Sequence, residues 1–173
     1  MSFSDYYCQF NDDILAIEQL ARIETENQSY LDRLLYANTI TLMESYLMNT
    51  FRLAISNNDS FRNKFIETHK KFKTEKIKVS NIYEKLTNID TDISKLSFHS
   101  YDNIKTYLSV ISPEINIGRL SLIFTACNKR HDIVHRNGKN KRGEVVQLTN
   151  QNLTELIIEM KSFIKKLHNS FIS

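Results

Sequence analysis

The run SYLDRLLYANTITLMESYLMNTFRLAIS, residues 29–56, predicts one long helix. Apolar side chains recur in it every three or four residues over about seven turns, with no glycine or proline to interrupt them. The recurring residues are Leu31, Leu34, Leu35, Ile40, Met43, Leu47, Phe51 and Ala54. At about 1.5 Å per residue such a helix spans a small domain. We therefore expect it to be the central helix of the fold.

Shorter helices are predicted on both sides of this central one. The first is predicted over 14–23, with Asn11, Asp12 and Asp13 as its cap. After the central helix, one is predicted from Asp59 to Phe72, leading into a basic run at 69–76, and a weaker one at 79–88. Another runs from Ser100 or Asp102 to Ile111, before Pro113, and a last one starts at Thr149 or Asn150. The last helix has the clearest apolar stripe, from Leu153 to Phe171. The sequence thus predicts an all-α fold, an antiparallel bundle of about five helices.

Composition supports an all-helical single domain. The chain has 173 residues, with 41% hydrophobic and 25% charged residues but only three glycines and one proline. That length suits one domain over residues 1–173, and so little turn-forming material disfavours a sheet. Cys8 and Cys127 are too few for a disulfide framework. With no apolar run of about 20 residues and no secretion signal, we expect a cytoplasmic protein without a membrane partner.

A charged segment interrupts the predicted helix before the last one. Leu120, Ile123, Phe124 and Cys127 form an apolar stripe that, if continued, would include Arg130, His131 and Val134. Only Val134 in that continuation is apolar, and the run RHDIVHRNG at 130–138 ends in Gly138, which tolerates a left-handed cap near Asn137. Cationic side chains in place of apolar ones need a partner, water or a ligand. This helix end is therefore the candidate site.

Basic residues gather at the same place. The net charge of +3 is modest, yet one short stretch contains Lys129, Arg130, Arg136, Lys139, Lys141 and Arg142. Such a cluster favours a polyanion or an acidic protein surface as the partner.

The pattern of Arg130, four further residues and then His135, close to the end of the penultimate long helix of an all-α domain, resembles the HEPN superfamily. The flanking run RHDIVHRNG is similar to the form found in stand-alone prokaryotic members, and Leu96-Ser-Phe-His-Ser100 is similar to a segment that those members often carry upstream. The resemblance covers most of the chain. It implies a HEPN-like helical domain.

The resemblance also implies an activity. Such a protein would be a metal-independent endoribonuclease, a homodimer whose two motif helices face each other across one composite cleft. His135 would remove the proton of the RNA 2′-hydroxyl, Arg130 would hold the phosphate, and His131 would orient His135 or protonate the leaving group. The RNA-contacting residues would be Lys129, Arg136, Asn137, Lys139, Lys141 and Arg142. No metal or other cofactor is expected. A toxin or antiviral-defence role, with a cognate antitoxin or defence partner, is implied by analogy.

Alternatives remain open at several positions. His131 is equally well explained by a hydrogen bond across the interface, and Asn137 is better explained as part of the helix cap than as a substrate contact. His99 has the setting of a packing histidine, and His69 and His168 that of surface residues. Asn137 stands where one toxin branch of the superfamily has a tyrosine that a partner modifies, so control by tyrosine modification is not expected.

Two alternative functions also remain open. One is a non-catalytic module that binds RNA or a nucleotide, and the other is an unrelated helical protein with an acidic partner.

Overall fold

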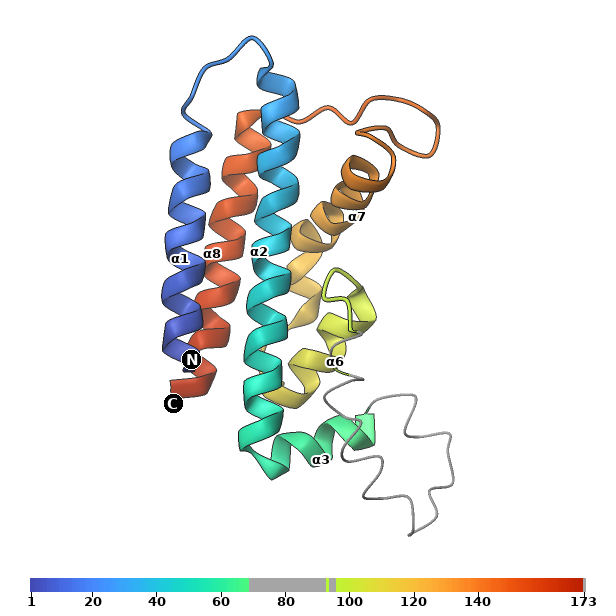
Figure 1. Cartoon of the computed structure of the whole chain (residues 1–173). Coiled ribbons are helices and arrows are strands. Elements are labelled where there is room, and N and C mark those ends of the chain that lie inside the picture. The colour runs from blue at the N-terminus through green and yellow to red at the C-terminus, as the bar shows by residue number, and fades with distance from the viewer. Residues whose placement is uncertain (69–92, 94–95, 173) are drawn as a thin grey trace.

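The computed structural model describes residues 1–68, 93 and 96–172, and these residues form six α-helices and one short 3₁₀ helix (Figure 1). The elements are α1 (Phe3–Leu20), α2 (Gln28–Asn57), α3 (Asp59–Thr68), α6 (Tyr101–Ile111), η2 (Ile117–Leu120), α7 (Ser121–His135) and α8 (Asn150–Ile172). The only β-type pairing in these ranges is an isolated bridge between Lys139 and Val145. None of their helices is long and apolar enough to cross a bilayer. The predicted basic run at 69–76, the helix at 79–88 and His69 lie outside the described residues.

Helix α2 is the central helix, as its sequence predicts. Its bounds differ from the predicted 29–56 by one residue at each end, and it contacts every other α-helix of the described part of the chain. Ile40, Met43, Leu47 and Phe51 are fully buried, whereas Leu34, predicted in the same stripe, is exposed. Because neighbours surround α2, its buried positions are spread around the helix and not confined to one stripe.

Helix α1 begins earlier than predicted. The structure starts it at Phe3, with Ser2 as the N-cap: the Ser2 hydroxyl accepts from the Asp5 backbone N–H, and the Asp5 carboxylate accepts from the Ser2 N–H. Reciprocal bonds of this kind satisfy two amides that would otherwise lack partners at the helix start. Asn11, Asp12 and Asp13 therefore lie inside the helix, and their prediction as its cap is wrong.

The bundle is antiparallel at most but not all of its contacts. Figure 1 shows α1 running against both α2 and α8, and α7 running against α2. Helices α2 and α8 are also neighbours, yet they run in the same direction. The predicted all-α bundle is confirmed, and its antiparallel arrangement fails for this pair. Between α2 and α8 the chain passes through α3, α6 and α7, and α7 leads it back to the end of the bundle where α2 begins. Helix α8 therefore starts at the same end as α2 and runs parallel to it.

Two aromatic contacts attach α1 to α8. Phe3 stacks on Phe171 with ring centroids 4.1 Å apart, and Tyr7 stacks on His168 at 4.2 Å. His168 is buried, with 8% of its surface exposed, so its prediction as a surface residue is wrong. Burial lowers the pKa of its imidazole, because the charged form loses hydration.

An aromatic cluster lies near the C-terminal end of α2, where α3 and α6 pack against it. Phe51 of α2 contacts the rings of Phe65, Phe98 and Tyr107 at centroid distances of 5.3, 5.8 and 5.3 Å. The Tyr107 hydroxyl has a hydrogen bond of 2.9 Å with the Thr50 hydroxyl, and both residues are fully buried. This cluster fixes α6 and the segment at Phe98, and thereby the position of the neighbouring His99.

Replacing Thr50 by valine tests the buried hydrogen bond. We expect the free energy of unfolding to fall by about 1–3 kcal/mol, because the Tyr107 hydroxyl is left without this partner in an apolar core. The double variant Thr50→Val/Tyr107→Phe removes both polar groups, so it should recover most of that loss. Urea unfolding of the wild type, both single variants and the double variant measures the coupling. Additive losses in the double variant would contradict the assignment.

Candidate functional site on helix α7

Helix α7 is closed at its C-terminal end by a left-handed turn. It ends at His135 with Arg136 as the C-cap, Asn137 has φ 52°, and Gly138 has φ 76°. The Gly138 N–H donates to the Ile133 carbonyl at 3.1 Å, which is the long hydrogen bond of a Schellman motif. The prediction of Asn137 and Gly138 as capping residues is confirmed. A Cβ on Gly138 would also lie 3.1 Å from Nε of Arg33, so the Arg33 side chain of α2 lies against this glycine.

The buried stripe of α7 is centred differently from the prediction. Its fully or nearly buried members are Leu120 just before it and Ile123, Ala126, Cys127 and Ile133 within it. These positions centre the stripe on Arg130. Val134, predicted to continue the stripe, is 51% exposed, and that prediction is wrong. The apolar residue on the core side is Ile133, because the stripe follows Ala126 and not Phe124.

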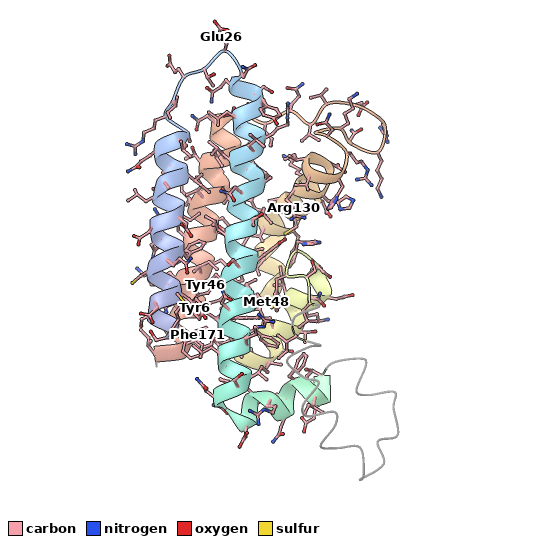
Figure 2. All side chains as sticks on the ribbon, viewed as in Figure 1. Tyr6, Glu26, Tyr46, Met48, Arg130 and Phe171 are labelled. Atoms are coloured by element: carbon pink, nitrogen blue, oxygen red, sulfur yellow. The ribbon has the colours of Figure 1, made fainter. Side chains whose placement is uncertain are left out.

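Arg130 therefore points towards the core and meets a carboxylate there. Its Nη2 lies 3.9 Å from Oε2 of Glu44 on α2, and the two side chains are 16% and 20% exposed. Figure 2 shows Arg130 where α7 passes α2. The Nε of Arg130 is buried and has no hydrogen-bond partner among the residues that the structure describes. A guanidinium in this setting depends on the nearby carboxylate for charge compensation.

His99 completes this group from a third segment. Its Nδ1 lies 2.7 Å from Oε1 of Glu44, and its ring is also within hydrogen-bond distance of the Ser97 hydroxyl. One carboxylate thus connects His99 to Arg130. The prediction of His99 as a packing histidine misses this contact with Glu44. Burial, followed by the Glu44 charge, raises the pKa of the adjacent Cys127 thiol to about 12, so Cys127 is an inert packing thiol.

The two histidines of the motif lie on the exposed side of α7. His131 and His135 are both exposed, and their ring centroids are 4.8 Å apart with the planes inclined by 44°. The pKa of His131 is lowered, first by loss of hydration and then by the charges of Arg136 and His135. Exposed Val134 lies between the two histidines in the sequence. Arg130 and His135 make no hydrogen bond or ion pair with each other within the described chain, and because His135 is five positions after Arg130, the two side chains are roughly 140° apart around the helix.

The six predicted RNA-contacting residues divide into two groups. Arg136, Lys141 and Arg142 line one groove of about 640 Å³, together with Asn128, His131, Asp132 and Asn140. Outside it, Lys129 lies over the Tyr36 ring at 5.9 Å, Lys139 forms the bridge to Val145, and Asn137 caps the helix. Within the groove the Arg136 guanidinium donates to the Asp132 carboxylate.

Two residues of this arrangement, Glu44 and His99, have no counterpart among the predicted site residues. In the sequence Glu44 follows Met43, which is buried, among other apolar residues of α2. A single carboxylate beside buried positions is the feature that could have indicated Glu44 as a site residue. In the described ranges no group of three or more His, Cys, Asp or Glu side chains could hold a metal ion.

Comparison with known proteins adds no relative to this picture. No protein-family model, no curated protein and no solved structure matches the chain. The assignment of a function therefore depends on the residues and their geometry.

Proposed function

We propose that this chain is a metal-independent endoribonuclease that acts as a homodimer on RNA in the cytoplasm. The observation that carries the proposal is the contact between two exposed imidazoles, His131 and His135, the first of which lines a groove together with Arg136, Lys141 and Arg142. Imidazoles transfer protons near neutral pH, and cations beside them attract the phosphates of RNA. The resemblance of the 130–138 run to the HEPN superfamily supports the same class and suggests a toxin or antiviral-defence effector.

In the proposed reaction His135 takes the proton of the 2′-hydroxyl. The 2′-oxygen then forms a bond to phosphorus, the bond from phosphorus to the 5′-oxygen breaks, and a 2′,3′-cyclic phosphate remains. The 5′-oxygen leaves with a proton from water or from His131. In the other role His131 orients His135, whose ring lies 4.8 Å from its own.

Arg130 would hold the phosphate and stabilise charge on its oxygens, as a guanidinium does in a fixed fork geometry. Its contact with Glu44 restrains the side chain, which is the preorganisation that such a role needs. Since Arg130 and His135 diverge around α7, a second copy would complete the cleft. Exposed Val134 between the two histidines is a suitable contact for a two-fold partner.

One observation favours a second candidate function. The Arg130 guanidinium faces Glu44, and only 16% of the Arg130 side chain is exposed. If this ion pair is mainly structural, the chain would be a non-catalytic module that binds RNA or a nucleotide through the groove.

Incubation with RNA in excess EDTA separates the two candidates. We expect the purified protein to elute as a dimer in light-scattering chromatography and to cut total RNA and tRNA into fragments with 2′,3′-cyclic phosphate ends. The chelator tests independence from divalent metals, and a parallel reaction with added Mg²⁺ is the control. Intact RNA that is nonetheless bound would select the binding module, and cleavage only with Mg²⁺ would contradict the proposed chemistry.

A further inference from the structure

We propose that the groove of Asn128, His131, Asp132, Arg136, Asn140, Lys141 and Arg142, here called the α7 groove, is a phosphate-binding subsite. It would hold a phosphodiester of the RNA strand next to the one that is cut. This inference rests on the proposed function, because it places a second part of the same substrate.

The size and charge of the α7 groove suit a nucleotide segment. Its volume of about 640 Å³ lies within the range of small-molecule sites. It contains three cations against one carboxylate, so its net charge is positive. In the described part of the chain no carboxylate lies within ion-pair distance of Lys141 or Arg142, whereas Arg136 is paired with Asp132. Two of its three cations are thus available to an anionic ligand.

The turn that presents these cations is braced by its own hydrogen bonds. Asn140 Oδ1 accepts from the backbone N–H groups of Arg142 and Glu144 at 2.8 and 3.1 Å, and its Nδ2 donates to the Glu144 carboxylate at 2.7 Å. The Val146 N–H donates to the Gly138 carbonyl at 2.8 Å, which ties the turn to the end of α7. A backbone already ordered in this way reduces the entropy lost on binding.

The position of His131 connects the groove to the proposed reaction. His131 lines the groove, and its ring lies 4.8 Å from that of His135, the proposed base. A strand with its reacting phosphate at His135 would therefore pass directly into the groove. Asn128 adds an exposed amide group, which can donate to a phosphate oxygen or pair with a base edge, whereas the Asn140 amide is already used within the turn. A strand of RNA satisfies the Asn128 amide and the imidazole as well as the cations, which favours it over an acidic peptide.

The salt dependence of RNA binding tests the subsite. The probe is a fluorescent 12-nucleotide 2′-O-methyl oligouridine, which cannot react, and its Kd is measured by anisotropy in EDTA over a range of salt concentrations. The test variant is Lys141→Gln/Arg142→Gln, since among the described residues neither side chain has a carboxylate partner that the fold would lose. Each lost phosphate contact lowers the slope of log Kd against log salt by about 0.7 for a single strand. We expect a decrease of about 1.4.

A charge-matched variant controls for net charge. Arg52→Gln/Lys105→Gln removes two exposed cations of α2 and α6 that are not part of the groove, and it should leave the slope unchanged. Equal slopes for both variants and the wild type, or binding of an oligoglutamate peptide as tight as that of the oligouridine, would overturn the subsite.

The outcome for the subsite is distinguishable from that for the proposed function. If the wild type fails to cut unmodified RNA while the groove variant still lowers the slope, the ribonuclease proposal fails and the subsite stands as a binding site. If the wild type cuts RNA and the groove variant keeps the wild-type slope, the ribonuclease proposal stands and the subsite fails.

Discussion

His135→Ala is expected to lower the rate of RNA cleavage by about 10²–10⁴-fold, the contribution typical of a general base. Its side chain is exposed, and its ring contact is with His131, so the substitution leaves the core untouched. The thermal midpoint should therefore match that of the wild type. Single-turnover cleavage in excess EDTA measures the chemical step, and circular dichroism with thermal melting measures the fold.

Thr125→Ala is the matched control for this variant. Thr125 is an exposed residue of the same helix, and it lies outside the α7 groove. The Thr125→Ala variant should cut RNA at the wild-type rate. If His135→Ala melts well below the wild type, His135 is a structural residue, and if it folds normally and cuts RNA at the wild-type rate, another group is the base.

The two longest amphipathic patterns were sufficient to predict their helices. The bounds of α2 and α8 follow from the sequence to within about a residue, because both present long uninterrupted periodicity. The start of α1 was missed although Phe3, Tyr7 and Phe10 continue its apolar stripe towards the N-terminus, because the polar run at residues 11–13 has the composition of a helix cap. The parallel pair α2 and α8 was missed for another reason, since local patterns carry no information on how a chain returns to the bundle.

Of the candidate site, only the residues that lie within a single helix were predicted from the sequence. The sequence places Arg130, His131 and His135 on one helix end, and the structure adds which of them point inwards. That distinction depended on small Ala126 and on Ile133, which shift the buried stripe by a fraction of a turn towards Arg130. Glu44 and His99 could not be derived, because they are 55 residues apart in the chain and meet only through the packing of α2 against the 96–100 segment.

The remaining large effect is expected at Arg130. Its variants should behave differently depending on whether Arg130 binds the phosphate or only stabilises the fold. Arg130→Lys keeps the positive charge beside Glu44 but loses the planar fork that holds a phosphate by two hydrogen bonds. We expect cleavage to fall by about 10²–10³-fold, as when an electrostatic stabiliser of a transition state is removed. The free energy of unfolding should change little. Single-turnover rates and urea unfolding of the same preparation measure both.

Arg130→Met separates the structural from the functional contribution, because it removes the charge while filling a similar space. It leaves Glu44 with His99 as its remaining partner at a position only 20% exposed, so the fold should lose roughly 1–3 kcal/mol. Adding Glu44→Gln removes the uncompensated carboxylate and should restore most of that stability, but it cannot restore cleavage if Arg130 binds the phosphate. Recovery of cleavage together with stability in the double variant would mean that Arg130 serves the fold alone. Recovery of stability without cleavage would mean that the guanidinium is required by the substrate, and that Glu44 is there to compensate its charge within the folded chain.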